Sequence, residues 1–140
     1  MMPLVVTALI EAAPSIRIEV MSSAFRKIHL GDGRALHHFT QGDDGDEYHS
    51  HPWPFKSEVL FGGYAEDIVV SLDPFTVLEQ RRLPGTTHQV EAGHIHRITR
   101  LLDEDCWTLV TAGPVVQYVR FYRLRDRGVQ SRLWNEGWEA

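Results

Sequence analysis

The histidines of this sequence are numerous and regularly spaced, which makes them the strongest candidates for a chemical role. Eight histidines occur among 140 residues, and four of them form two His-x-His pairs, His49 with His51 and His94 with His96. Residues two apart in a β-strand point to the same face, so each pair can direct two imidazoles at one ion. Neutral imidazole is a good ligand for zinc, iron, nickel and copper. The spacing favours a transition-metal site, and the alternative is a set of solvated or packed histidines.

The residues beside the two pairs interrupt regular structure. Pro52 and Pro54 remove backbone donors directly after the first pair, so the chain must turn just beyond His51. Ala92 and Gly93 precede the second pair and favour a tight turn. We expect the turn after His51 to leave the metal site open on one side, where water, dioxygen or a chelating substrate can bind.

Composition and charge narrow the class of protein. The sequence is 43% hydrophobic and 24% charged, which is ordinary for a globular protein, and its length predicts a single domain over residues 1–140. A net charge of -5 and the lack of a dense basic cluster disfavour a nucleic-acid partner. The single cysteine, Cys106, cannot form an internal disulfide, which favours the cytoplasm.

No stretch approaches the roughly 20 apolar residues that span a bilayer, so we expect no membrane insertion. The apolar N-terminal run lacks a basic region and contains Glu11. We therefore expect packed structure there rather than a secretion signal.

The elements that must position the histidines are strands. Turn-forming residues recur about every ten positions after Gly31, and apolar residues alternate between them, which is typical of an all-β sandwich or barrel. Apolar residues at helical spacing after Pro14 predict a short N-terminal helix over residues 15–28, with a strand over residues 16–20 as the alternative. The expected strands cover residues 34–40, 47–51, 57–62, 64–72, 75–83, 86–91, 94–101, 106–111 and 115–124.

Two short segments lie outside this pattern. The acidic loop GDDGDE at residues 42–47 lacks the spacing of a calcium-binding loop, and we interpret it as a solvated turn. The tail over residues 131–140 is expected to dock through Trp134 and Trp138.

The order of these motifs resembles the cupin superfamily. In that family a first motif has the pattern G, five residues, HxH, three or four residues, E, six residues, G. A second motif has the pattern G, five residues, PxG, two residues, H, three residues, N. His49 and His51 match the first histidine pair, His96 matches the third histidine, and Gly93 matches the motif glycine, with Glu91 in place of the proline. The resemblance implies a double-stranded β-helix, or jelly-roll barrel, over about residues 34–124, with these three histidines as metal ligands.

The sequence departs from the family pattern at two positions. Phe55 or Lys56 stands where the family has its glutamate ligand, and Glu58 comes two residues later as a candidate replacement. Arg100 stands where the second motif has asparagine. The stretches HSHPWPF and GGY resemble a group of small cupin-like proteins, a likeness that implies the fold and no substrate.

Other polar and aromatic residues are candidates for roles around the metal. His94 is a possible fourth ligand or general base, and Glu66 is a possible carboxylate ligand or a partner that holds a histidine tautomer. Candidate catalytic residues are His94, Tyr64 and His37. Candidate residues of the substrate pocket are Trp53, Phe55, His88 and Glu66, and candidate metal ligands are His49, His51, His96 and Glu58. Packing or solvent exposure is the alternative for each.

The leading functional hypothesis is a cupin enzyme with one divalent metal per chain, acting on a small polar organic substrate. Iron(II) is favoured over zinc, manganese or nickel, and a dioxygenase is favoured over an isomerase or lyase. One alternative is a non-catalytic module that binds a sugar or another small ligand. Another is a metal-independent, epimerase-like cupin with a histidine base and a tyrosine acid. Exposed sheet edges predict a homodimer.

Overall fold

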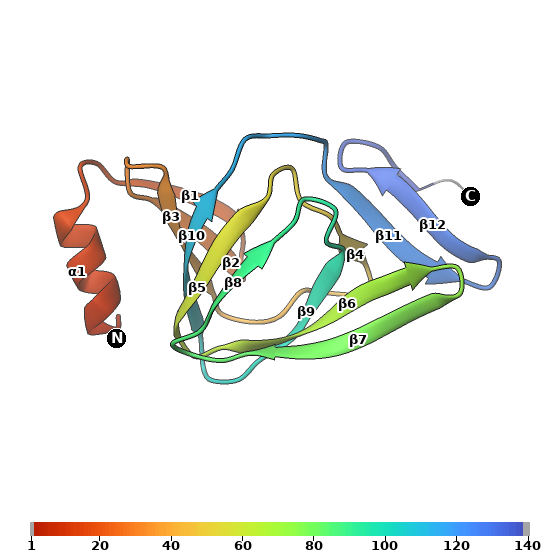
Figure 1. Cartoon of the computed structure of the whole chain (residues 1–140), viewed down its shortest axis with the longest axis horizontal. Helices are drawn as coiled ribbons and strands as arrows, with labels where there is room; N and C mark the ends of the chain where they lie inside the picture. Colours follow the sequence, from red (N-terminus) through yellow and green to blue (C-terminus); the bar gives the residue numbers. More distant parts are fainter. Residues whose placement is uncertain (1, 139–140) are drawn as a thin grey trace.

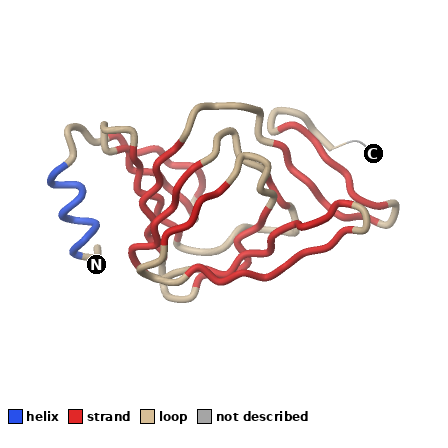
Figure 2. The backbone as a smooth tube through the Cα atoms, viewed as in Figure 1, coloured by secondary structure: helices blue, strands red, loops and turns tan. Residues whose placement is uncertain are grey.

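The computed structural model describes residues 2–138 and is built almost entirely of antiparallel strands (Figures 1 and 2). Helix α1 (Leu4–Ala12) stands at one end of the molecule, beside the first of two six-stranded sheets. Sheet A contains, in spatial order, β1 (Arg17–Ser22), β2 (Phe25–His29), β3 (Arg34–Phe39), β10 (Cys106–Ala112), β5 (Phe55–Phe61) and β8 (Thr87–Val90). Sheet B contains β12 (Gly128–Leu133), β11 (Arg120–Arg125), β4 (Tyr48–His49), β9 (His96–Leu101), β6 (Tyr64–Leu72) and β7 (Phe75–Arg82).

The strand pattern confirms the predicted all-β jelly roll. Each of the nine expected strands is present. The bounds of β6 are as predicted, and the other strands have shifted ends; the largest shift is in the last one, which begins at Arg120 rather than at residue 115. The sequence-based prediction did not include β12, which pairs with β11 as a hairpin.

The helix predicted over residues 15–28 is wrong, and the strand alternative is correct. This segment forms the hairpin of β1 and β2, in which Ser22 pairs with Phe25 across a turn at Ser23 and Ala24. Pairing of β2 with β3 supplies backbone hydrogen bonds that a helix would have to make internally. The short N-terminal helix does exist, but it lies earlier, over Leu4–Ala12.

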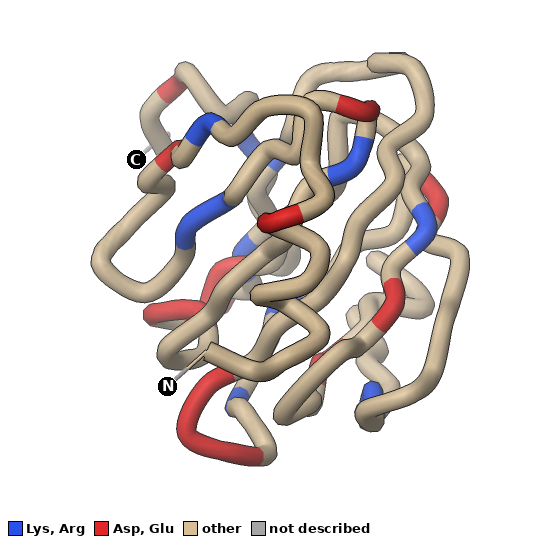
Figure 3. Tube along the Cα trace, turned by 90° about the vertical axis from the view of Figure 1, so that its left-hand side faces the viewer, with Lys and Arg blue, Asp and Glu red and all other residues tan. Residues whose placement is uncertain are grey.

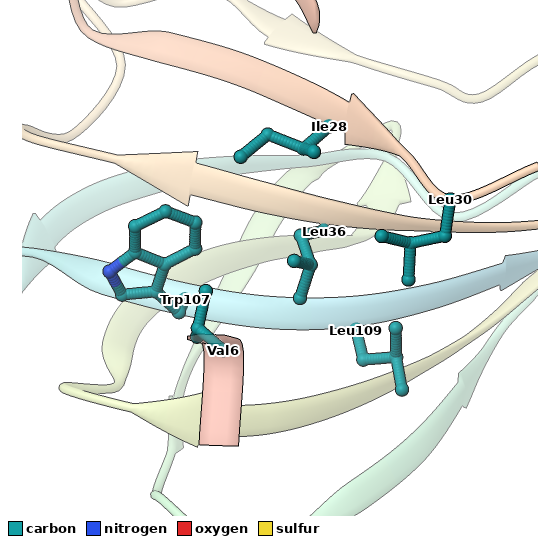
Figure 4. Close-up of a cluster of buried hydrophobic side chains, with 6 residues drawn as sticks. All are labelled: Val6, Ile28, Leu30, Leu36, Trp107 and Leu109. Carbon is teal, nitrogen blue, oxygen red and sulfur yellow. The ribbon is translucent and has the colours of Figure 1, made fainter. Parts of the chain in front are cut away.

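Side chains alternate along each strand, so one face of sheet A packs against the helix and the other faces sheet B. The outer face packs against α1, where Val6 of the helix contacts a dry cluster and is itself fully buried (Figure 4). That cluster consists of Val6, Ile28, Leu30, Leu36, Trp107 and Leu109. Each fully buried aliphatic side chain of this kind stabilises the fold by roughly 1.5–3 kcal/mol. The apolar N-terminal run is therefore packed structure, as expected.

The inner face of sheet A turns toward sheet B. A second apolar cluster of Val59, Tyr64, Ile98 and Cys106 lies between the sheets, and Cys106 within it is fully buried. Burial raises the pKa of the Cys106 thiol to about 11, so it remains a protonated, small apolar side chain. Beyond this cluster the space between the sheets is not filled by side chains and forms the cavity described below.

The C-terminal tail docks through only one of its two tryptophans. The indole N–H of Trp138 donates to Glu47 Oε1 at 2.9 Å, and the Arg123 guanidinium lies 4.1 Å from a Trp138 ring centroid. Trp134, in contrast, is 56% exposed, so its predicted docking role is wrong. Residues 139 and 140 of the predicted tail lie outside the described residues.

Charged residues of both signs are distributed along the chain and over several segments (Figure 3). Surface pairs such as Arg125 with Asp46, at 3.0 Å, contribute little to stability because water and salt screen them. The chemistry of the cavity is therefore set by the groups that line it. Among residues 2–138, no helix is long and apolar enough to cross a membrane.

Candidate metal centre

Three of the predicted ligands meet at one wall of the cavity. His49 ends β4 and pairs in register with His96 at the start of β9, and His51 follows two residues after His49. The candidate ligand atoms of these three histidines all lie within 4.8 Å of one another. The ring centroids are 5.3 Å apart for His49 and His51, and 4.8 Å apart for each of these with His96.

Hydrogen bonds fix the orientation of two of the rings. The Nδ1–H of His51 donates to the backbone carbonyl of His94 at 3.0 Å. The Nδ1–H of His96 donates to Glu66 Oε1 at 3.0 Å. Since the carbonyl and the carboxylate oxygen accept these protons, the Nε2 atom of each ring keeps its lone pair. This is the arrangement in which a protein histidine binds a metal.

Burial keeps these imidazoles neutral. It lowers the pKa of His51 to about 2, and the neighbouring imidazoles add to the effect. Burial also lowers the pKa of His96, which is only 7% exposed, although the Glu66 carboxylate opposes the shift. A neutral ring is the form that binds a metal, so no proton has to leave at neutral pH.

The two prolines after His51 belong to a turn beside the site, and Pro52 itself lines the cavity. Pro52 and Pro54 have no N–H to donate, but the carbonyl of Pro52 accepts from Val116 N at 2.8 Å. The Gln117 amide bridges two carbonyls, those of His51 and Ala92, at 2.8 Å each. The HPWP segment is thus tied to the loop before β11, which lets it turn without leaving its backbone unpaired.

Behind the three histidines lies a buried ionic cluster around Glu66. The Glu66 carboxylate is 1% exposed and accepts from His94 Nε2 at 2.9 Å, His96 Nδ1 at 3.0 Å and Arg82 Nε at 3.0 Å. Burial alone would raise the pKa of Glu66, but the hydrogen bonds from His94, His96 and Arg82 outweigh it and hold the pKa well below its usual range. Glu66 is therefore an ionised acceptor that holds the ring of His96.

A glycine pair before β6 forms the tight turn from which the strand that carries Glu66 begins. Gly62 and Gly63 both have a φ of 84°, in the left-handed region that favours glycine. A Cβ at Gly62 would overlap the carbonyl oxygen of Asp105, and one at Gly63 would lie 2.6 Å from the carbonyl oxygen of Arg82. The tight turn that these glycines allow begins β6 directly beside Arg82.

The cavity in front of the histidines has a volume of about 480 Å³. Aromatic and aliphatic side chains dominate its lining, which comprises Met21, Phe25, Phe39, Pro52, Trp53, Phe55, Ile98, Val110, Val119 and Phe121. Its polar residues are Lys27, His37, Asp43, His49, Ser50, His51, Ser57, Tyr64, His96 and Thr108. A low-polarity enclosure of this size suits a small organic molecule and strengthens electrostatic contacts inside it.

The residues predicted for the substrate pocket and for catalysis fall into two groups, those that line the cavity and those that do not. Trp53, Phe55 and Tyr64 line the cavity, and so does His37, which projects from sheet A. His88 is not among the lining residues, and its Nε2 atom lies 3.5 Å from the Tyr64 hydroxyl. Burial, reinforced by the nearby Glu66 carboxylate, raises the pKa of Tyr64, so its phenol keeps its proton.

Glu58 and His94 lie outside the three-histidine group. Ser57 on β5 faces the cavity, so alternation along the strand turns Glu58 to the outer face of sheet A. Within the described residues, neither group of candidate ligands includes Glu58. His94 does not line the cavity, and its ring instead donates to Glu66 from behind.

Sequence reasoning missed Asp43, which lies in the loop interpreted as a solvated turn. Asp43 lines the cavity, and its Oδ2 atom is 3.7 Å from His49 Nε2. The same oxygen accepts from Ile98 N at 2.8 Å, and Asp43 N donates to the Ile98 carbonyl at 2.8 Å. A Cβ at Gly42 would lie 2.9 Å from that carbonyl oxygen. In the sequence, the available signal was the glycine directly before Asp43, because a glycine allows the loop backbone to lie close to a strand of the barrel.

Comparison with known proteins supports the fold and leaves the activity open. No family model matches the sequence, and no curated protein matches it. The structure is similar to Fe(II) HppE, with a TM-score of 0.56 and 12% identity over 71% of this chain and 57% of that one. The chain therefore spans little more than half the length of HppE.

Two further solved structures share the architecture. The Drosophila melanogaster CENP-C cupin domain has a TM-score of 0.55 and 10% identity over 77% of this chain and 92% of that one. The capsular polysaccharide assembling protein CapF from Staphylococcus aureus has a TM-score of 0.57 and 13% identity over 76% of this chain and 30% of that one. At these identities the likeness concerns the fold alone.

Proposed function

We propose that this chain, which has the cupin fold, is a single-domain enzyme that binds one divalent transition metal through His49, His51 and His96. The convergence of the three rings on one cavity wall carries the proposal. A neutral Nε2 lone pair on a ring held by its other nitrogen is the usual form of a protein metal ligand. Three nitrogen ligands fit iron(II), and also zinc, manganese or nickel.

A carboxylate ligand from Asp43 would complete this set better than one from Glu58. Asp43 already lies 3.7 Å from His49 Nε2, on the cavity side of the barrel. Asp43 is in neither group of candidate ligands, and its Oδ2 accepts from Ile98 N at 2.8 Å, so its side chain would have to move to reach an ion shared with His49. We therefore propose Asp43, in place of Glu58, as the candidate fourth ligand.

The second group of potential ligands, Glu66 with His94 and His96, is the support of the centre rather than a metal site. Its ligand atoms also lie within 4.8 Å of one another. The Arg82 guanidinium, however, lies 3.0 Å from Glu66 Oε2 and already neutralises the carboxylate. A second cation at this place would be repelled by Arg82 at close range.

A dioxygenase is the reaction class we favour. When bound, iron(II) supplies Lewis acidity and redox chemistry with dioxygen. The similar structure of HppE is described as an Fe(II) form, which supports iron in this fold. The apolar cavity would hold a small organic substrate and limit access of water. An isomerase or lyase using the same metal is the nearest alternative.

Two alternatives do not require catalysis by a metal. The CENP-C structure bound to CAL1 has the same fold, at a TM-score of 0.56, which supports a binding module as one alternative. The protonated phenol of Tyr64 in a cavity with the neutral imidazoles of His37 and His51 would serve an epimerase-like mechanism. The metal content of the purified protein separates the epimerase-like alternative from the metalloenzyme. Exchangeable water on a bound metal separates the binding module, in which a metal would only stabilise the fold.

The direct test is metal analysis of three proteins purified in parallel and reconstituted with iron(II) without air. They are the wild type, His51→Ala and, as a matched control, His29→Ala, whose ring pairs with Glu19 outside the site. We expect about one metal per chain in the wild type and in His29→Ala, and almost none in His51→Ala. Equal metal content in all three would rule out this centre.

We also propose a homodimer formed along the edge strand β1. Ile18 and Val20 on this strand are 56% and 73% exposed, which leaves apolar side chains and an unpaired sheet edge in water. Light scattering of the wild type should give twice the chain mass, and Val20→Lys should shift it toward the monomer. A monomeric wild type at micromolar concentration would contradict the dimer.

We propose the cytoplasm as the location, because the one cysteine is buried and needs no oxidising compartment. Cell fractionation should recover the protein with cytoplasmic markers. Recovery with a membrane or secreted fraction would contradict this location.

A further inference from the structure

Lys27 is the one lysine or arginine among the residues that line the cavity. It lies on β2, and the chain has only one other lysine, Lys56. The Lys27 ammonium lies 5.6 Å from the ring centroid of Trp53 and 5.9 Å from that of Phe25. A positive charge in these apolar surroundings requires an explanation.

Glu19 stands opposite Lys27 in the register of β1 and β2 and attracts its charge, but the Glu19 carboxylate forms its ion pair with His29. Within residues 2–138, no acidic oxygen lies within 4.0 Å of Lys27 Nζ. A second hollow adjoins the cavity and shares Lys27; in its lining His29 pairs with Glu19 at 2.9 Å and Arg34 with Asp32 at 2.8 Å, and Arg17 is a further cation. Burial lowers the pKa of Lys27, because its ammonium loses hydration, and the attraction of the Glu19 carboxylate opposes this shift without cancelling it.

His37 provides a hydrogen-bonding group beside Lys27. The two residues are direct partners across β2 and β3, so their side chains leave the sheet on the same face. Burial and the nearby Lys27 charge lower the pKa of His37 to about 3, so its ring stays neutral and carries one N–H. Within the described residues, no hydrogen bond contributes to the pKa shift of the His37 ring.

Aromatic rings separate Lys27 from the metal centre. The centroid of the His51 ring lies 5.1 Å from that of Phe55, which lies 5.4 Å from that of Trp53, and Trp53 in turn contacts Lys27. Lys27 belongs to sheet A, whereas His49 and His96 belong to sheet B. A ligand that reaches both places must therefore carry an apolar body between its two polar ends.

From this geometry we infer that the cavity binds a small monocarboxylate with an apolar body, whose carboxylate pairs with Lys27 and accepts from His37. At this end of the cavity one ammonium that forms no ion pair, beside one neutral imidazole, balances a single negative charge, which favours a monoanion over a dianion. The apolar body lies against Phe25, Trp53 and Phe55. That the opposite end of this ligand faces the reacting centre rests on the proposed function; the carboxylate subsite itself does not.

The test compares two probes that differ only at the polar end, 3-phenylpropanoate and 3-phenylpropan-1-ol. Calorimetry measures their binding to iron-loaded and to chelator-treated protein, in the wild type, Lys27→Met and Lys27→Arg. Lys56→Met is the matched control because Lys56 is exposed on β5, next to the cavity-lining Phe55 and Ser57. We expect the acid to bind at least about tenfold more tightly than the alcohol in the wild type, Lys56→Met and Lys27→Arg. In Lys27→Met this preference should disappear.

Comparing the iron-loaded with the chelator-treated protein tests the carboxylate subsite independently of the metal centre. A preference for the acid that depends on Lys27 in the chelator-treated protein supports the subsite even if no metal binds. A preference that appears only with iron and survives in Lys27→Met means that the carboxylate binds the metal, which overturns the subsite while it supports the metal centre. Equal or undetectable binding of acid and alcohol in every preparation also overturns the subsite.

Discussion

The two His-x-His pairs look alike in sequence and do different work in the structure. His49 and His51 both line the cavity. The second pair divides, because His96 lines the cavity while His94 donates to the buried carboxylate of Glu66. The rule that residues two apart share a face holds only where the backbone stays extended.

Backbone hydrogen bonds explain this difference. The first pair stays extended past the end of β4, because Ser50 N donates to the Arg120 carbonyl and His51 N to the Ala92 carbonyl. His94 N instead donates to the Glu91 carbonyl, which closes a turn just before β9 begins at His96. One pair therefore provides two ligand candidates, and the other provides one ligand candidate and one supporting residue.

Removing a ring of the first pair should have the largest effect. In His51→Ala a candidate ligand is lost, and we expect metal affinity to fall by more than about 100-fold, beyond the 10- to 100-fold typical of supporting residues. Titration with zinc against a coloured competing chelator measures it. Affinity within tenfold of the wild type would mean that the first pair does not bind the metal.

Changing the carboxylate that supports the second pair should have an intermediate effect. Glu66→Gln keeps the size of the side chain but removes the charge that holds the His96 ring and neutralises Arg82. We expect metal affinity to fall about 10- to 100-fold. We also expect unfolding to become easier by about 3–5 kcal/mol, because the change leaves Arg82 without its partner. Unchanged values of both quantities would remove Glu66 from the support of the centre.

The pH dependence of stability should report the buried neutral rings. His51 and His37 have pKa values lowered to about 2 and about 3, whereas unfolded histidine titrates near 6.5. As pH falls below about 6.5, only the unfolded chain takes up these protons, so the free energy of unfolding decreases. Glu66 acts in the same direction only below about 4.5, its ordinary value.

We therefore expect metal-free protein to lose about 1–2 kcal/mol of unfolding free energy per buried histidine between pH 7 and pH 5. Denaturant titration at each pH measures this loss, and His37→Gln should make the slope shallower by about one proton. A flat profile for the wild type over this range would contradict neutral buried rings.

Removing the other member of the second pair should have the smallest effect on metal binding. His51 donates to the backbone carbonyl of His94, and His94→Ala keeps that carbonyl. Glu66 also keeps His96 and Arg82 as donors. We expect zinc affinity to fall less than about tenfold, below the range of Glu66→Gln. A loss as large as in His51→Ala would make His94 a ligand and the two pairs equivalent.

Much of the fold was predictable from the sequence, because turn residues and period-two alternation are local signals. The hairpin of β1 and β2 was not, because Val20, Met21 and Phe25 also fit a helix and only pairing with β3 decides between the two. For the site, His49, His51 and His96 were found from spacing and motif. Asp43 and Lys27 were missed because only the tertiary fold brings a surface-like loop and an edge hairpin to the cavity.

The central claim is the position of one metal among the three histidines that line the cavity. Its most direct test is an anomalous difference map from a crystal of the protein loaded with iron or zinc. We expect one peak bonded to the Nε2 atoms of His49, His51 and His96, with Glu66 still hydrogen-bonded to His96 Nδ1. A peak between Glu66 and His94, or no peak in metal-loaded crystals, would contradict the claim.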